Sequence, residues 1–310
     1  MLEVAHTCLR IGREIGKGAF GRVFMASAVN IAGCPDPLIV AVKQLKKSSK
    51  TDAFDEFLDE IAMMKRVGRH PNIVTLLGCC TIKEPLTMIM EYIGCGDLVS
   101  LYTTLSGKTA KSGTSIEYVL DHNELHDFAQ QIACGMHHLE KIKITHRDLA
   151  ARNILIDERK TLKISDFGMS RTGIYVNTRN KKVPLRWLSI EAMRDNFYSS
   201  KSDVWAFGVV LWEIGTLGGF PYPSVSNHEL LAFLQEGNRM AKPDNITPEL
   251  YELMQTCWKP NPDDRPSFRE IRTFLEPHRQ IYIDFNEIEP SYVFPPTAEQ
   301  SRQTMANNKS

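Results

Sequence analysis

The residues best suited to chemistry lie in one short segment, His146-Arg147-Asp148-Leu149-Ala150-Ala151-Arg152-Asn153. Apolar runs flank this segment, and buried flanks would hold the ends of a loop and aim Asp148 and Asn153 at one point. A strand-like run over residues 162–165 then leads into Asp166. Carboxylate and amide oxygens of this kind suit Mg²⁺, which also takes phosphate oxygens and water. These three side chains therefore predict a magnesium site.

A glycine-rich segment, Gly16-Lys17-Gly18-Ala19-Phe20-Gly21, lies near the N-terminus. Glycines let backbone N–H groups approach phosphate oxygens closely. The bare motif also fits a tight hairpin with no ligand. A dinucleotide-binding fold would need a helix directly after the glycines. Residues 23–26 read as a strand instead, so the pattern predicts a hairpin that covers phosphates.

Lys43 ends the apolar run 38–42, which predicts a strand. In isolation a solvent-facing lysine fits equally well, but its distance after the glycine segment favours phosphate binding. Residues 52–66 have the apolar spacing of a helix. The apolar residues concerned are Phe54, Phe57, Leu58, Ile61 and Met64. Glu60 lies on or beside that face, where a charge needs a partner, so we expect it to pair with Lys43. Glu56 is the competing carboxylate and is expected to face solvent.

The composition is that of a globular protein with a substantial core, since 43 % of the 310 residues are hydrophobic. Lys and Arg total 37, as do Asp and Glu, and this balance argues against bulk binding to nucleic acid or a membrane surface. The seven cysteines form no C-x-x-C pair, which indicates free thiols in a reducing compartment. No run approaches the length of a membrane span, so we expect this chain to be soluble.

The middle of the chain predicts two more strands and a linker. Residues 73–77 and 86–90 are strand-like, and Glu91-Tyr92-Ile93-Gly94-Cys95-Gly96 follows. Its extended backbone could meet the flat edge of an adenine, although an ordinary linker fits the same residues. Residues 103–121 are rich in Thr, Ser, Gly and Lys and predict a flexible insertion. A long amphipathic helix then leads into the segment that contains Asp148.

Beyond Asp166-Phe167-Gly168, the polar and basic residues 169–184 predict a mobile loop with one tyrosine, Tyr175. A phosphate there would pair with nearby arginines and order the loop, although an ordinary exposed tyrosine is the alternative. Helical patterns follow at 187–193 and 202–216.

Asp203 stands at the start of the second of these helices, where an acid complements the helix dipole. Helical patterns recur to about Pro277, and we expect a loosely ordered tail after it.

In this order, the pieces resemble the eukaryotic protein-kinase domain from about Ile11 to Pro277. The succession of glycine segment, strand lysine, helix glutamate, H-R-D-x-x-x-x-N and D-F-G is far more specific than any one motif. The features that resemble the tyrosine-specific branch are Ala150-Ala151-Arg152, Pro184-Leu185-Arg186-Trp187 and Cys257-Trp258 with Arg265-Pro266. The insertion, His70-Pro71-Asn72-Ile73-Val74 and Cys79-Cys80 look most like receptor kinases for fibroblast, vascular and platelet-derived growth factors. One departure is Ser189-Ile190-Glu191, where the family has A-P-E.

The resemblance implies an α+β, two-lobed protein kinase fold, with a small β-rich N-lobe that carries one helix and a larger helical C-lobe. Residues 1–10 would be a juxtamembrane-like lead-in, and 278–310 a loosely ordered C-terminal tail. The implied parts of the kinase domain (11–277) are N-lobe 11–90, hinge 91–96, C-lobe 97–277 and insert 103–121.

The resemblance also implies a protein tyrosine kinase that depends on ATP and on Mg²⁺ or Mn²⁺. Asp148 would orient the substrate hydroxyl and accept its proton, with Arg152 bonded to it. Asn153 and Asp166 would hold the metal. Lys43, fixed by Glu60, would hold the phosphates. The implied further nucleotide contacts are Gly16, Lys17, Gly18, Gly21, Val23, Ala41, Met90, Glu91, Tyr92, Ile93 and Leu155.

Regulation is implied at several further residues. Phosphorylated Tyr175 would pair with Arg147 or a basic loop residue. Buried Glu191 would pair with Arg265. The residues expected to stack in the active form are Met64, Leu76, Phe167 and His146.

The partners implied are protein substrates that carry tyrosine, a second copy for phosphorylation in trans, and SH2-type readers of Tyr282 and Tyr292, without nucleic acid. The chain would be the cytoplasmic part of a single-pass plasma-membrane receptor. The alternatives are a non-receptor kinase, a dual-specificity kinase and a pseudokinase scaffold. A pseudokinase predicts a lesion in the catalytic set, and none is present at Lys43, Asp148, Asn153 or Asp166.

Overall fold

A computed structural model describes residues 2–17, 21–46, 51–102, 122–176 and 184–276. Residue contacts divide the chain into two units, Met1–Leu275 and Glu276–Ser310, and every helix and strand described below belongs to the first. The predicted insertion, loop residues 177–183 and the tail with Tyr282 and Tyr292 lie outside the described residues.

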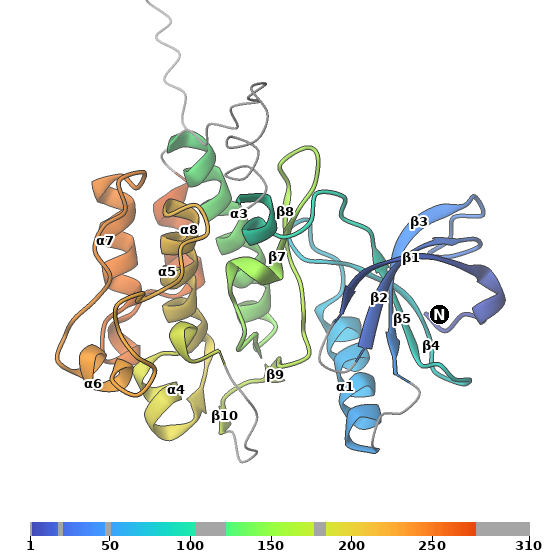
Figure 1. The fold of residues 1–310 in the computed structure, drawn as a ribbon, viewed down its shortest axis with the longest axis horizontal. Coiled ribbons are helices and arrows are strands. Elements are labelled where there is room, and N and C mark those ends of the chain that lie inside the picture. The colour runs from blue at the N-terminus through green and yellow to red at the C-terminus, as the bar shows by residue number, and fades with distance from the viewer. Residues whose placement is uncertain (1, 18–20, 47–50, 103–121, 177–183, 277–310) are drawn as a thin grey trace, which may run out of the picture. The chain divides into compact units, whose positions relative to one another are not determined.

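The first part of this unit is built on a five-stranded antiparallel sheet in the order β1-β2-β3-β5-β4 (Figure 1). Its strands are β1 (Leu9–Lys17), β2 (Gly21–Ala28), β3 (Leu38–Leu45), β4 (Leu76–Cys80) and β5 (Thr87–Glu91). Successive side chains of a strand point to opposite faces of its sheet. Val40 and Val42 of β3 are fully buried in an apolar cluster with Ala26 and Ala28. Ala41 and Lys43 therefore point to the other face.

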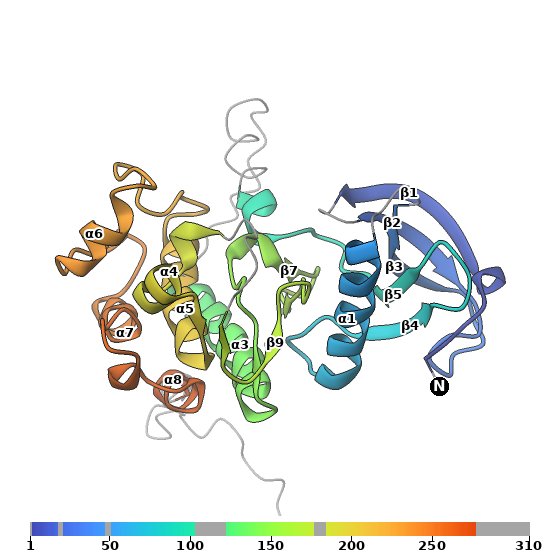
Figure 2. The same ribbon diagram turned by 90° about the horizontal axis from the view of Figure 1, so that it is seen from below.

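One long helix, α1 (Thr51–Val67), accompanies this sheet (Figure 2). Phe57, Ile61 and Met64 are buried at the predicted helical spacing. Phe54 is an exception, because it is 36 % exposed in the first turn. The spacing of apolar residues indicates which face of a helix is apolar, but not how much of its length another element covers.

The strand predicted at 73–77 begins only at Leu76. Ile73 instead forms a parallel bridge with Ile164, and the N–H of Val74 donates to the carbonyl of Ile164 at 2.9 Å. These two residues are buried, as an apolar run predicts, but their backbone pairs with a distant segment rather than with β5. The hydrophobic pattern of a segment therefore predicts its burial, but not the segment with which its backbone forms hydrogen bonds.

The second part of the unit is mostly helical (Figures 1 and 2). Its named helices are α3 (His122–Lys141), α4 (Ile190–Asp195), α5 (Ser200–Gly215), α6 (Leu230–Gln235), α7 (Pro248–Cys257) and α8 (Phe268–Leu275). Short antiparallel pairs join β6 (Ile144–Thr145) to β9 (Arg171–Thr172), β7 (Ile154–Ile156) to β8 (Leu162–Ile164), and β10 (Tyr175–Val176) to β11 (Phe197–Tyr198). Helix α5 is buried along nearly its whole length and contacts α3 and α7, so it forms the centre of this part.

The helix predicted at 187–193 is interrupted. A 3-10 turn, Leu185–Trp187, is followed by extended backbone at Leu188, and α4 begins only after Ser189. Ser189 has extended backbone (φ −72°, ψ 164°), which is typical of the residue before a helix. The apolar pattern continued across this break because both sides of it are buried.

The fold is of the α+β class, as predicted, with an antiparallel sheet and helix followed by a mostly helical region. Among the helices of the described ranges, none has the length and apolar character needed to cross a membrane. All seven cysteines are free thiols, which agrees with the sequence-based expectation.

Candidate active site

A cleft of about 750 Å³ is lined by residues of both the sheet and the helical part. The predicted nucleotide contacts that line it are Gly16, Lys17, Val23, Ala41, Lys43, Met90, Glu91, Tyr92, Ile93, Leu155 and Asp166. Gly21 is not among the lining residues. A Cβ atom there would lie 2.6 Å from the carbonyl oxygen of Gln44, so Gly21 permits the close pairing of β2 with β3. Gly18 lies outside the described residues.

Lys43 and Glu60 form the predicted ion pair inside this cleft. The Lys43 Nζ atom donates to both carboxylate oxygens of Glu60, at 2.6 and 2.8 Å. Burial by itself would lower the pKa of Lys43, but the carboxylates of Glu60 and Asp166 outweigh it and raise that pKa. Lys43 is therefore a fixed cation in the cleft. Glu56 is half-buried rather than fully solvent-facing, and it does not replace Glu60.

The loop that carries Asp148 is held in place by Asp203 of α5. The N–H groups of His146 and Arg147 donate to its two carboxylate oxygens at 2.7 and 2.9 Å. Burial raises the pKa of Asp203 to about 7, although these two N–H donors act to lower it. Asp203 thus lies in the first turn of α5, as predicted, and its carboxylate also anchors this loop. Arg147 has a positive φ of 70°, so the loop turns sharply where Asp203 binds it.

Asp148 is held by two neighbours on the same loop. Arg152 Nη2 donates to its Oδ1 atom. Asn153 Nδ2 donates to its Oδ2 atom at 2.9 Å and to its backbone carbonyl at 2.7 Å. Burial raises the pKa of Asp148, nearby Asp166 adds to the increase, and Arg152 opposes it. A carboxylate with a raised pKa is a stronger base than an exposed one, so the surroundings of Asp148 favour proton acceptance at this carboxylate.

His146 and Phe167 lie together beneath the site. Their ring centroids are 5.2 Å apart in an edge-to-face arrangement, and both side chains are buried. Burial lowers the pKa of His146 to about 4, so its ring is neutral near pH 7. Asp148 N–H donates to Nδ1 at 3.3 Å, which leaves Nε2 to donate to the Ser165 carbonyl at 3.1 Å. Met64, Leu76 and Phe167 are all buried in the main apolar core, whereas the predicted stacking of Met64 and Leu76 on Phe167 stays a prediction.

Asn153 and Asp166 fit a metal bound through phosphate. The Asn153 side chain donates through Nδ2 to Asp148, and no described residue donates to its side-chain oxygen Oδ1. Asp166 has a positive φ of 60° and is exposed to the cleft, where it accepts a 3.3 Å bond from Gly168 N–H. The described residues contain no cluster of three His, Cys, Asp or Glu ligands that would bind a metal alone. One carboxylate and one amide oxygen suit Mg²⁺ that also takes phosphate oxygens and water.

Tyr175, the predicted regulatory residue, stacks on Arg147. The guanidinium carbon lies 4.3 Å from the Tyr175 ring centroid and 4.2 Å from that of Tyr198. Tyr175 and Tyr198 are paired residues of β10 and β11. Arg171 lies 5.7 Å from the Tyr175 ring, so two cations flank this tyrosine.

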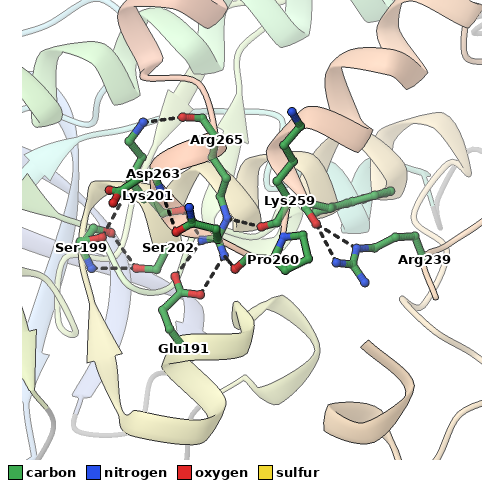
Figure 3. Close-up of polar contacts among 11 residues, drawn as sticks. Glu191, Ser199, Lys201, Ser202, Arg239, Lys259, Pro260, Asp263 and Arg265 are labelled. Atoms are coloured by element: carbon green, nitrogen blue, oxygen red, sulfur yellow. Dashed lines mark hydrogen bonds and ion pairs between the residues drawn. The ribbon is translucent and has the colours of Figure 1, made fainter. Parts of the chain in front are cut away.

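Glu191 and Arg265 form the predicted buried ion pair away from the cleft (Figure 3). Arg265 Nη1 and Nη2 donate to the two carboxylate oxygens of Glu191 at 2.7 and 2.8 Å. The carbonyls of Lys201, Lys259 and Pro260 accept its other three N–H bonds. All five donors of the guanidinium are therefore used, and the missing proline of Ser189-Ile190-Glu191 leaves this pairing intact.

Two acids that the sequence analysis did not assign to the site lie in α5. Asp203 anchors His146 and Arg147, and Glu213 accepts hydrogen bonds from Ala151 N–H and Trp187 Nε1. A signal was present, because charged residues within an otherwise strongly apolar helix must be buried and therefore need partners. The partners themselves lie too far along the chain to be read from local spacing.

The fold and site define a protein kinase domain. Residues 9–275 match the sequence profile of the family described as protein tyrosine and serine/threonine kinase, and the chain belongs to that family. It is similar to the protein named fibroblast growth factor receptor 1 from Xenopus laevis, with 40 % identity over 305 residues that cover 92 % of this chain and 37 % of the receptor.

Two invertebrate relatives have similar names. The fibroblast growth factor receptor homolog 1 of Drosophila melanogaster is 38 % identical over 320 residues, covering 99 % of this chain and 43 % of that protein. The fibroblast growth factor receptor of Strongylocentrotus purpuratus is 37 % identical over 298 residues, covering 92 % and 31 %. The chain thus spans less than half the length of each of these relatives.

Proposed function

We propose that this chain is a protein tyrosine kinase that transfers the γ-phosphate of ATP to tyrosine hydroxyls of protein substrates. The observation that carries the proposal is the placement of Asp148. It is bonded by Arg152 and Asn153, which line the same cleft as the Lys43–Glu60 pair.

The nucleotide would occupy the cleft of about 750 Å³. Val23 and Ala41 from the sheet and Leu155 from β7 would enclose the adenine, with Met90 at the back. The backbone of the hinge, Glu91-Tyr92-Ile93, would bind the adenine edge. Lys43 would hold the phosphates, since Glu60 fixes its ammonium group within the cleft.

Asn153 and Asp166 would hold the metal. When bound, Mg²⁺ would neutralise charge on the transferring phosphate. Phosphoryl transfer passes through a loose transition state, so positioning and charge stabilisation supply most of the catalysis. Asp148 would orient the tyrosine hydroxyl and accept its proton, with its carboxylate held by Arg152 and Asn153.

Selectivity for tyrosine is supported by the residues beside Asp148. Arg152 stacks over the ring of Trp187, with its guanidinium carbon 4.5 Å from the ring centroid. Trp187 ends the segment Pro184-Leu185-Arg186-Trp187, which would hold the ring of a substrate tyrosine. Two residues after Asp148, where serine/threonine kinases usually carry a lysine, this chain has the small Ala150, so the cation beside Asp148 is Arg152.

We infer further that the chain is the cytoplasmic catalytic part of a receptor, a proposal supported by its similarity to proteins named as fibroblast growth factor receptors. Phosphorylation of Tyr175 by a second copy would regulate it, and Arg147 and Arg171, which lie against the Tyr175 ring, would pair with the phosphate. SH2-type readers of Tyr282 and Tyr292 remain part of this proposal.

The test compares the wild-type chain with Asp148→Asn in the presence of ATP, Mg²⁺ and a poly(Glu,Tyr) substrate. We expect the variant to lower turnover by about 10²–10⁴-fold, the usual contribution of a general base. Binding of a non-hydrolysable ATP analogue, measured by calorimetry, should be retained. Asp157→Asn is the control, because Asp157 only closes the turn between β7 and β8.

Phosphoamino-acid analysis of the product separates the alternatives. Phosphotyrosine alone is the expected result. Phosphoserine or phosphothreonine beside it would indicate a dual-specificity kinase. A wild-type chain that binds nucleotide without transferring phosphate would be a pseudokinase scaffold.

A further inference from the structure

Glu213 is a buried acid of α5 that connects two parts of the site. It is 3 % exposed. Its Oε2 atom accepts a hydrogen bond from Ala151 N–H at 2.9 Å and another from Trp187 Nε1 at 2.8 Å. Ala151 belongs to the loop of the proposed base, and Trp187 to the segment proposed to hold the substrate ring. One oxygen atom therefore binds two elements that must be placed relative to each other for transfer.

The position is costly for a carboxylate. Burial raises the pKa of Glu213 to about 7, against the opposing effects of the Trp187 and Ala151 hydrogen bonds and of Arg152, while Asp148 adds to the increase. Burial and the nearby charge of Asp148 both disfavour an ionised carboxylate at this position, so a compensating role is expected. The two hydrogen bonds indicate that this role is structural control of the site.

The contacts continue from Trp187 to the base. Arg152 lies over the indole ring at 4.5 Å, and the same guanidinium donates to Oδ1 of Asp148. The long side chain of Arg152 is 37 % exposed, so protein atoms cover only part of it. The indole face of Trp187 is one of the surfaces that restrict its position. Fixing the indole through its N–H group therefore also limits the position of the guanidinium on Asp148.

We propose that Glu213 is a positioning residue for tyrosine phosphorylation: it holds Trp187 and the Asp148 loop at one spacing, and thereby places Arg152 and the base against the substrate phenol. This inference rests on the proposed function and adds to it a residue that does not touch substrate. Glu213 acts through Trp187, whereas the nucleotide is bound by other residues. Loss of Glu213 should therefore impair transfer to tyrosine more than it impairs ATP binding.

The experiment uses the full chain and three variants: Glu213→Gln, Trp187→Phe and the double variant. Glu213→Gln keeps the size of the side chain and removes its charge. Trp187→Phe keeps an aromatic face for Arg152 and removes the N–H donor. Trp212→Phe is the matched control, since it removes an indole N–H bond from the same helix, to the carbonyl of Ala241 at 3.1 Å.

We expect each single variant to lower kcat for a tyrosine peptide about tenfold, because Trp187→Phe removes a hydrogen bond to a charged group and Glu213→Gln replaces the charged acceptor of both bonds by a neutral one. The KM for ATP should stay within about twofold, because uniform binding of nucleotide is unaffected. The kcat of the double variant should be no lower than that of the slower single variant, because the effects of substituting two residues that act through one contact do not add. Trp212→Phe should retain wild-type kcat.

A second measurement follows the contact itself. The chain has four tryptophans. In a ¹⁵N spectrum the indole signal absent from Trp187→Phe identifies Trp187, and we expect Glu213→Gln to shift that signal and leave the other three in place.

The proposal is overturned if Glu213→Gln shifts the Trp187 signal without changing kcat, or leaves the signal unshifted. Additive losses in the double variant would also overturn it, as would a parallel loss of ATP affinity and thermal stability, which a general folding defect produces. A wild-type chain without tyrosine transfer would instead contradict the proposed function, and this inference with it. A wild-type chain with normal transfer and unaffected variants would contradict the inference alone.

Discussion

Lys43 Nζ lies 2.6 Å from Oε1 and 2.8 Å from Oε2 of Glu60, although 17 residues separate the two in the sequence. The lysine comes from β3 and the glutamate from α1. The pair therefore joins the helix to the strand at the wall of the cleft, and its geometry depends on the position of α1.

Glu60→Gln should reduce kcat/KM for ATP by about 10- to 100-fold, equivalent to the 1.5–3 kcal/mol of a hydrogen bond to a charged group. The physical reason is that Lys43 loses the carboxylate that fixes its ammonium group. Steady-state kinetics at varied ATP concentration measure the effect. Asp59→Asn, at the exposed neighbour of Glu60 on α1, is the control and should stay near wild type. Equal losses in both variants would show that α1, not this pair, was disturbed.

The ion pair of Glu191 with Arg265 predicts a large effect on stability. Its arginine side chain is fully buried and its glutamate 8 % exposed. Glu191→Gln should lower the free energy of unfolding by about 3–5 kcal/mol, because it leaves a buried guanidinium without its charged partner. Urea unfolding measures the change.

The same helix supplies a control for that experiment. Arg194 and Asp195 form an exposed pair at 2.7 Å, with side chains 58 % and 46 % exposed. Arg194→Ala should change the free energy of unfolding by less than about 0.5 kcal/mol, as surface substitutions usually do. If both variants lowered the free energy of unfolding by a similar amount, the loss in Glu191→Gln would reflect a general sensitivity of α4 and not the burial of its ion pair.

Tyr175→Phe should slow the rise in activity that follows addition of ATP and leave the initial rate unchanged. A phosphate on Tyr175 would lie near Arg147 and Arg171, and its charge would pair with them. Activity and phosphopeptide mass are followed together over time. Tyr251→Phe in α7 is the control, where the hydroxyl only donates to the carbonyl of Met240. Unchanged activation kinetics in Tyr175→Phe would rule out this switch.

Asp203 predicts a pH dependence of stability. Its pKa is about 7 in the folded chain and about 3.9 in a model peptide, so the folded state binds the proton more tightly. The stabilisation that follows is present at low pH and is lost as pH rises through about 7. Between pH 6 and 8 this one group should lower the free energy of unfolding by about 1.4 kcal/mol.

Asp203→Asn removes this ionisation and should flatten the change between pH 6 and 8 by that amount. Glu213, whose pKa is also about 7, should maintain a slope of similar size in the variant. Urea unfolding at both pH values measures the difference, with Asp55→Asn on the exposed side of α1 as the control. A wild-type chain whose stability is the same at both values would contradict the assignment.

Residue types and short-range spacing determined much of the site. The segment from His146 to Asn153 predicted the proposed base and its neighbours, and helical spacing over 52–66 selected Glu60 rather than Glu56 as the partner of Lys43. Inferences of this kind succeed because side-chain direction along a helix or strand is a local property with a fixed period.

Other features depended on contacts between distant segments. Asp203 and Glu213 bind residues 57 and 62 positions earlier in the chain, and nothing in their local pattern names those partners. The backbone of Val74 pairs with Ile164 rather than with the adjacent strand, and the apolar residues around Ser189 belong to two separate helical segments. The sequence by itself determined which polar groups were candidates for the chemistry of the site. Only the tertiary structure decided which buried acids hold them in place, because burial and hydrogen bonding between distant segments exist only after the chain has packed.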